Sequence, residues 1–186
     1  MSLPGVTASA GPCGRLALAV AGLLVGTSAE PALAEHPATT LATLLDRAQI
    51  EDLLVGYYNH LGHDESSFGT YYVPDGVLDV NGLVAQGEKP IGELYKKIAA
   101  GSPPLKGTFH MLLSNPMVVV NGDTATADVL WTGVISETLQ AAPRFVEQGR
   151  EHDELVKRKG HWYFKHRVIT SDGGLQPMFE KLYKAR

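Results

Sequence analysis

Residues 107–131, GTFHMLLSNPMVVVNGDTATADVLW, decide the fold class of this chain. The hydrophobic pattern has a period of two on both sides of Asn121-Gly122-Asp123, a connection typical of a tight β-hairpin. The stretch therefore predicts two long antiparallel strands, at 107–120 and 124–137. Two further strands are expected at 145–158 and 161–170, joined by Lys159-Gly160.

The residues before these strands follow a helical period instead. Apolar side chains recur at spacings of three and four from Ile50 to Leu61, which predicts a helix ending near Gly62. Asp46 with Gln49 predicts a capping box at an inner start of this helix. Shorter elements are expected after it: helices at 65–72, 91–100 and 177–184, a turn at 73–76 and a strand at 77–80. Helices followed by a meander of long strands predict an α+β fold.

The first 34 residues have the pattern of a secretory signal. A single basic residue, Arg15, precedes the apolar run 16–26, and Ala32-Leu33-Ala34 is a small-residue cleavage site. The run is too short to span a bilayer, so no stable membrane insertion is expected after cleavage. We therefore expect residues 1–34 to be removed and residues 35–186 to form a single domain, periplasmic or secreted. The alternative is an anchoring or buried helix.

Composition excludes several classes of function. The 186 residues include 16 Lys and Arg against 20 Asp and Glu, a net charge of −4, which argues against nucleic-acid and anionic-lipid partners. The only cysteine, Cys13, lies in the expected signal, so the mature chain has no disulfide and no thiolate nucleophile. Although there are seven histidines, no HExxH, CxxC or GxSxG motif occurs, which disfavours a metal site or a serine hydrolase.

Three stretches together resemble the SnoaL-like group of the nuclear transport factor 2-like superfamily, which includes polyketide cyclases and dehydratases. They are residues 46–61 (DRAQIEDLLVGYYNHL), residues 107–131, and residues 149–169 (GREHDELVKRKGHWYFKHRVI). The resemblance implies a cone-shaped, curved antiparallel sheet wrapped around N-terminal helices, with an internal apolar cavity. It also implies acid–base catalysis without a metal or other cofactor, and a homodimer or homotrimer.

The resemblance points to three catalytic candidates. His110 matches the histidine that the family carries in its first long strand, and imidazole suits proton transfer. Asp64 is the expected carboxylate partner, but the family spacing falls on Gly62 or His63, so His63 and Asp64 both remain candidates for the acid. Tyr58 is expected to protonate or hydrogen-bond an oxyanion on the ligand. The alternatives are a core histidine, a helix-capping Asp64 and a packed tyrosine.

Five further residues are candidates for binding the substrate. Tyr57 lies beside Tyr58 on the apolar helix face, and Trp131 and Leu112 are expected in the cavity wall. The third long strand is polar on both faces, and Arg150 and His152 share one of them. This pair is expected to grip an anionic or phenolic group. The alternative is an edge or interface strand with surface ion pairs.

The sequence thus favours a cofactor-independent lyase of the dehydratase, elimination or retro-aldol type. The expected substrate is a small apolar molecule, aromatic or polycyclic, and the catalysis is centred on His110. The alternative is a non-catalytic exported ligand-binding or interaction domain of the same fold. The two differ in geometry, because catalysis requires His110 and a carboxylate to lie within hydrogen-bond reach and to open onto an enclosed pocket.

Overall fold

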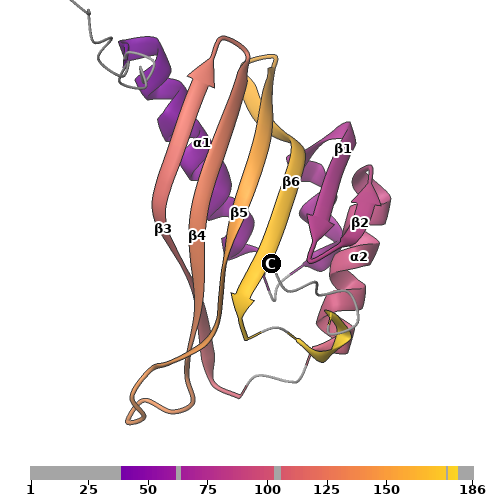
Figure 1. Cartoon of the computed structure of the whole chain (residues 1–186), viewed down its shortest axis with the longest axis vertical. Coiled ribbons are helices and arrows are strands. Elements are labelled where there is room, and N and C mark those ends of the chain that lie inside the picture. Colours follow the sequence, from indigo (N-terminus) through magenta and orange to yellow (C-terminus); the bar gives the residue numbers. More distant parts are fainter. Residues whose placement is uncertain (1–38, 62–63, 103–105, 175, 180–186) are drawn as a thin grey trace, which may run out of the picture. The chain divides into compact units, whose positions relative to one another are not determined.

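The computed structural model describes residues 39–61, 64–102, 106–174 and 176–179. The strands in these ranges form one six-stranded sheet (Figure 1). The strand order is β2-β1-β6-β5-β4-β3. The elements in chain order are α1 (Leu41–Asn59), the 3₁₀ helix η1 (Glu65–Tyr71), β1 (Tyr72–Val80), β2 (Leu83–Gln86), α2 (Glu88–Gly101), β3 (Thr108–Asn121), β4 (Thr124–Ser136), β5 (Arg144–Arg158), β6 (His161–Gly173) and the 3₁₀ helix η2 (Pro177–Phe179).

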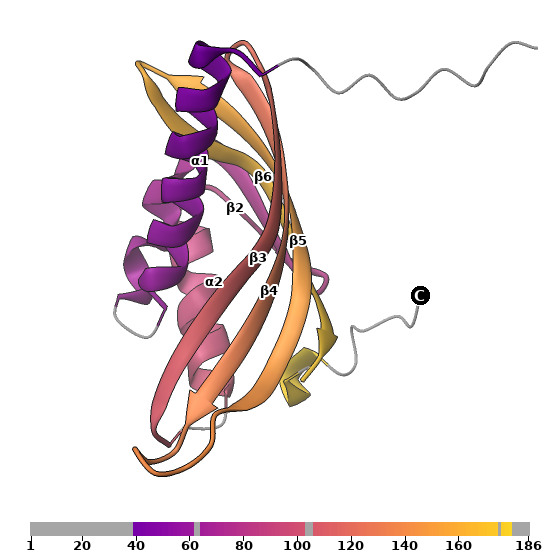
Figure 2. The same ribbon diagram turned by 90° about the vertical axis from the view of Figure 1, so that its left-hand side faces the viewer.

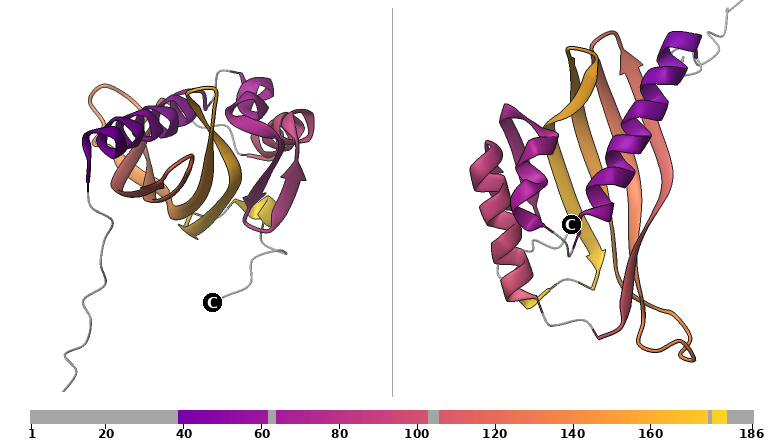
Figure 3. Two further views of the ribbon diagram at one scale, coloured as in Figure 1. Left: turned by 90° about the horizontal axis from the view of Figure 1, so that it is seen from above. Right: turned by 180° about the vertical axis from the view of Figure 1, so that it is seen from behind.

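The predicted α+β class is confirmed, with one difference in the sheet. The sheet is curved, and α1 crosses its concave side while η1 and α2 pack beside β1 and β2 (Figures 2 and 3). All strand pairs are antiparallel except β1 with β6, which run parallel. The chain between β1 and β6 contains β2, α2 and the strands β3, β4 and β5, and a parallel pair needs such a long connection. No helix of the described residues is long and apolar enough to cross a bilayer.

The four long strands lie within a few residues of their predicted bounds. Exposure alternates along β4, where Ala125, Ala127, Val129 and Trp131 are buried on the concave side. Lys159 and Gly160, the two central residues of their turn, have positive φ angles of 51° and 83°, as a two-residue type I′ hairpin turn requires. The period-two pattern was sufficient to locate these strands, because one face of each strand packs on α1 and the core while the other face is exposed to solvent.

Two local predictions were wrong. Residues 73–76 do not end an element: they form an irregular part of β1, where the pairing with β6 shifts between Tyr72 and Val77. The strand β2 was not predicted, although the Asn81-Gly82 turn (φ 52° and 90°) joins it to β1. The expected signal at 1–34, the helix end at Gly62 and the final helix beyond Phe179 lie outside the described residues.

The N-terminus of α1 is capped by different residues than predicted. Thr40 and Thr43 form the capping box, so the helix begins five residues before Asp46. Asp46 is buried and its carboxylate accepts hydrogen bonds from Lys157 Nζ (2.5 Å) and Trp162 Nε1 (3.1 Å). The Lys157 bond holds the pKa of Asp46 below its usual value. The side chain that was read as a cap therefore attaches α1 to the β5–β6 hairpin.

Two glycines let aromatic rings lie directly on the concave side of the sheet. Gly149 pairs with Trp131, and a Cβ at Gly149 would lie 2.4 Å from the Trp131 ring and 2.2 Å from the Thr170 carbonyl oxygen. A Cβ at Gly133 would similarly lie 2.9 Å from the Phe109 ring. Distances this short are steric clashes, so these positions exclude any larger side chain as long as the rings keep their places.

Replacing Asp46 with Ala should lower the free energy of unfolding by about 2 kcal/mol, because the buried Trp162 N–H loses its acceptor. Urea denaturation followed by tryptophan fluorescence measures the effect. Asp52→Ala, on the exposed side of the same helix, is the matched control and should change the stability by less than about 0.5 kcal/mol. Equal losses in the two variants would contradict the proposed anchoring.

Replacing Gly149 with Ala should destabilise the fold by about 1–3 kcal/mol, because the new methyl group meets both a backbone oxygen and the Trp131 ring. Gly173→Ala is the control in β6, since its Cβ would make an ordinary contact of 3.5 Å with Gln148. Thermal unfolding and the near-ultraviolet circular dichroism of tryptophan check both variants. An unperturbed Gly149→Ala spectrum would show that the ring does not lie against this strand.

Candidate functional site

A cavity of about 120 Å³ lies on the concave side of the sheet. Tyr58 of α1, Leu61 in the turn after it, and Tyr95 and Ile98 of α2 face strand residues there. The cavity therefore lies between α1, α2 and the sheet. The strands and the C-terminal segment contribute Val80, Asn81, Met111, Trp131, Glu147, Ile169, Ser171, Gln176 and Phe179. The wall is largely apolar with a few polar groups, which is the usual make-up of a small-molecule site.

Glu147 is the carboxyl group in this wall. It lies on β5 opposite Gly133, whose missing side chain leaves room for the Glu147 methylene groups. Burial away from water raises the pKa of Glu147 above its usual value. Among the described residues that line the cavity, no other carries a carboxyl group. A carboxyl whose pKa is raised towards neutrality can both accept and return a proton.

Hydrogen-bond donors lie in the same wall. The Nε1–H of Trp131 is buried and has no acceptor among the described residues. Gln176 accepts a hydrogen bond from Ser102 Oγ through Oε1 (2.7 Å), which leaves its amide N–H groups for other partners. Asn81 and Ser171 bond to each other, Nδ2 to Oγ at 3.0 Å. The cavity wall therefore combines one carboxyl whose pKa is raised with the amide of Gln176 and the Asn81–Ser171 pair.

A charged cluster lies buried beneath the helix tyrosines. Arg167 on β6 is fully buried, and its Nη2 donates to Glu151 Oε2 on β5 at 2.5 Å. The second acid, Asp153, lies 3.5 Å from Arg167 Nε. Burial raises the pKa of Asp153 well above its usual value. Buried ionic groups of this kind are costly to desolvate and are often associated with function.

The two helix tyrosines make different contacts. Tyr58 donates its hydroxyl hydrogen to Glu151 Oε2 and lines the cavity. Tyr57 is fully buried beside Arg167, and its hydroxyl bonds to those of Tyr95 and Tyr72, the latter at 3.2 Å. Burial raises the pKa of Tyr57 and Tyr58 well above the usual value and that of Tyr95 to about 12. Tyr57 is not among the residues that line the cavity.

The structure does not bring His110 to the cavity. Met111 lines the cavity, and Phe109 and Leu113 share its face of β3, so His110 and Leu112 project from the opposite, outer face. Both are exposed, Leu112 by 51%. The family resemblance supplied the position of His110 in the strand but not the face on which that position lies. Leu112, which the sequence placed in the cavity wall, lies on the same outer face.

Asp64 does not pair with His110 either. It is an exposed N-cap of η1, and its carboxylate accepts from the backbone N (3.1 Å) and Oγ (2.5 Å) of Ser66. These bonds hold its pKa below the usual value. The alternative interpretation, a helix cap, therefore describes its contacts. His63, the other candidate for the family's acid, lies outside the described residues.

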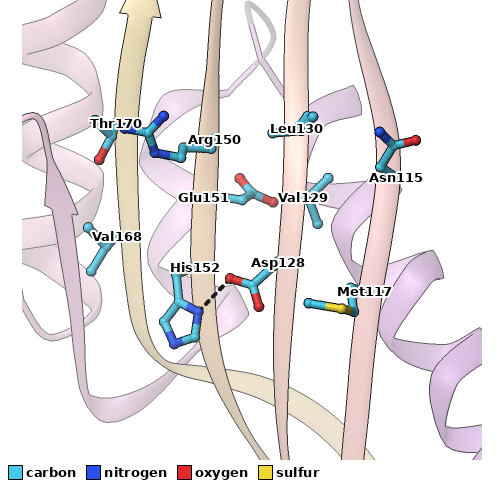
Figure 4. Close-up of a pocket in the computed structure, with 10 residues that line it drawn as sticks. All are labelled: Asn115, Met117, Asp128, Val129, Leu130, Arg150, Glu151, His152, Val168 and Thr170. Carbon is cyan, nitrogen blue, oxygen red and sulfur yellow. Dashed lines mark hydrogen bonds and ion pairs between the residues drawn. The ribbon is translucent and has the colours of Figure 1, made fainter. Parts of the chain in front are cut away.

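Arg150 and His152 lie on the outer face of β5, in a shallow hollow of about 350 Å³ (Figure 4). His152 Nδ1 bonds to Asp128 Oδ1 at 2.7 Å, and Arg150 pairs with Asp172 at 2.6 Å. All four side chains are partly exposed. Arg150 and His152 thus lie outside the concave cavity, because the strand register turns Glu151 and Asp153 inward instead. The outer pair has the contacts of surface ion pairs, the alternative that the sequence left open.

Sequence reasoning missed Glu147, Glu151, Asp153 and Arg167 as site residues. The signal was present in part, because residues 150–154 are polar on both faces and one of those faces had to be inside. Without the register, neither face could be chosen. Glu147 carried no signal, because a single Glu near a strand end is ordinary. No group of three or more His, Cys, Asp or Glu side chains that could hold a metal ion occurs in the described part of the chain.

Solved structures of other proteins share this fold at low sequence identity. A protein of unknown function with a cystatin-like fold from Nostoc punctiforme is 24% identical, with a TM-score of 0.62 over 72% of this chain and 96% of that one. A proposed scytalone dehydratase from Novosphingobium aromaticivorans is 18% identical (TM-score 0.57; 77% and 91% covered). ActVI-ORFA from Streptomyces coelicolor is also 18% identical (TM-score 0.58; 68% and 97% covered).

The sequence comparisons assign the family. No match was found among curated proteins. The family model of the SnoaL-like domain matches residues 42–168, which span α1 to the middle of β6 and include the strands that carry Glu147, Glu151 and Arg167. The match covers well over half of the chain. This protein therefore belongs to the SnoaL-like domain family.

Proposed function

We propose that the protein is a cofactor-free lyase of the dehydratase type, which removes water from a small β-hydroxy carbonyl compound bound in the concave cavity. Membership of the SnoaL-like family and the fold shared with a proposed scytalone dehydratase support cyclase- or dehydratase-type chemistry. The observation that carries the proposal is Glu147, a carboxyl with a raised pKa in a largely apolar wall. Raising the pKa of a carboxyl by burial is a usual way in which an active site prepares it for acid–base work.

One carboxyl is enough to balance this elimination. Ionised Glu147 takes the proton from the carbon next to the carbonyl group, and the resulting enolate oxygen accepts hydrogen bonds from donors such as the Gln176 amide. The carbon–oxygen bond to the hydroxyl group then breaks. Glu147 returns its proton to the departing hydroxide, so water and an unsaturated carbonyl compound leave and the carboxylate is restored. No redox step and no additional proton source are required.

The volume of the cavity limits the size of the substrate. An engineered apolar cavity of about 150 Å³ in another protein holds one benzene molecule. The cavity here, at about 120 Å³, therefore suits a single ring. We accordingly propose a single-ring substrate in place of the polycyclic one that the sequence also allowed.

The test is dehydration of 3-hydroxycyclohexanone, followed by the ultraviolet absorbance of the enone. The wild-type protein should produce cyclohexenone, and Glu147→Gln should lower kcat/KM by about 10²–10⁴-fold, since the amide cannot carry the proton. His110→Ala, on the outer face, is the matched control and should retain activity. Because the base form of Glu147 starts the reaction, activity should rise as pH increases through its raised pKa.

Two results would contradict this assignment. Full activity in Glu147→Gln together with a loss in His110→Ala would restore the histidine-centred mechanism. Tight binding of cyclohexanone without any turnover of 3-hydroxycyclohexanone would support the non-catalytic ligand-binding domain, an alternative that the outward position of His110 favours. Tryptophan fluorescence reports this binding directly, because Trp131 lines the cavity.

A further inference from the structure

We propose that Tyr58 acts in the cavity as a fixed hydrogen-bond acceptor, so that the site selects single-ring ligands that donate a hydroxyl or amine hydrogen to it. The hydroxyl hydrogen of Tyr58 is committed to Glu151 Oε2. A phenol has one hydrogen to donate but also lone pairs that accept. Tyr58 therefore presents only its acceptor side to a ligand, which is the reverse of the proton-donating role that the sequence predicted.

The direction in which Tyr58 donates its hydroxyl hydrogen depends on which acid of the buried cluster pairs with Arg167. Arg167 supplies one positive charge and faces two carboxyl groups. Glu151 has the shorter contact, 2.5 Å against 3.5 Å for Asp153, and it also accepts from Tyr58. An unpaired buried charge is strongly unfavourable, so a single arginine balances a single carboxylate. Arg167 thus pairs with Glu151, and burial raises the pKa of Asp153 well above its usual value.

The arginine is also prevented from moving to the other acid. Its guanidinium carbon lies 4.0 Å from the centre of the Tyr57 ring and 4.4 Å from that of Phe164. Stacking on two buried rings fixes the plane of the guanidinium, and Arg167 is fully buried. The Arg167–Glu151 pair consequently stays in place when the cavity fills, and Tyr58 keeps its orientation.

This inference deepens the proposed function, on which it rests for the nature of the bound molecule. A β-hydroxy carbonyl substrate has one hydroxyl hydrogen to donate and one carbonyl oxygen to accept. Tyr58 meets the first, and the amide N–H groups of Gln176 suit the second. The two polar ends of the substrate are thus distinguished, which orients the carbon that loses its proton with respect to Glu147.

The experiment measures binding rather than turnover, so it separates this inference from the dehydratase proposal. Phenol donates a hydrogen bond, whereas anisole, with a methyl group on the same oxygen, only accepts. Isothermal titration calorimetry should show that Tyr58→Phe weakens phenol binding by about five-fold, the loss of one hydrogen bond, and leaves anisole binding unchanged within two-fold. Equal losses for the two ligands, or no binding of phenol to the wild type, would overturn the inference.

Glu151→Leu supplies a second arm of the same experiment. Leu has no acceptor atom, so the Tyr58 hydroxyl hydrogen is no longer held and anisole should gain affinity relative to phenol. If this variant does not fold because Arg167 loses its partner, the Tyr58→Phe comparison still decides. A folded Glu151→Leu protein with the wild-type preference for phenol would contradict the control of Tyr58 by Glu151.

Asp153→Asn tests the raised pKa of Asp153, because Asn has the shape of a protonated Asp. Binding of phenol and anisole should be unchanged. An acid whose pKa is raised on folding stabilises the fold fully below its unfolded pKa, and this contribution is lost as pH rises towards the folded pKa. The melting temperature of the wild type should therefore fall on going from pH 5 to pH 9, and that of Asp153→Asn should fall less.

The charged and titratable groups around Asp153 come from every element packed on it. They are Arg167, Glu151, Asp128, Tyr72 and Tyr95. Only Asp153 is changed in the variant, so a difference in the pH dependence of melting between the two proteins belongs to its carboxyl group. An equal or steeper fall in the Asp153→Asn protein would contradict the raised pKa of Asp153.

Discussion

The whole interior of this domain is organised around the charge of Arg167. A fully buried guanidinium cannot be hydrated, so the fold must provide a counter-charge and aromatic faces within a few ångströms. β5 supplies the two acids, β6 supplies the arginine, and α1 closes over them with Tyr57 and Tyr58. The need to neutralise and cover the buried charge of Arg167 therefore constrains both the register of β5 against β6 and the position of α1 on the sheet.

The same requirement links structure to chemistry. The cluster reaches the cavity through Tyr58, whose ring lines the wall and whose hydroxyl bonds to Glu151. Glu147 lies on the same strand as the two buried acids but is not paired with a cation in the described structure, so its proton affinity is set by burial instead. One strand thus carries carboxyls in two electrostatic environments, one set by the charge of an arginine and one set by burial alone.

The elements could be predicted from the sequence much better than the site. Period-two alternation and the Lys159-Gly160 turn locate the long strands, because each strand has one buried face. Alternation does not say which face is inside when both are polar, and in β5 it therefore did not show that Arg150 and His152 lie on the outer face. In β3 the match to the family histidine gave the position of His110 along the strand, but not the face of the sheet on which it lies. Asp46 was read as a cap because its partners, Lys157 and Trp162, are remote in sequence.

The separation of Asp46 from its partners has a consequence for how the chain folds during synthesis. Lys157 and Trp162 follow it by 111 and 116 residues, so they leave the ribosome long after α1 has been made. Until then α1 lacks the hairpin that receives its buried acid, and its apolar face has little sheet to pack against. Contacts of such long range delay folding until most of the chain is available. The nascent domain thus remains open for nearly the whole of translation, a period in which chaperones have access to its exposed apolar segments.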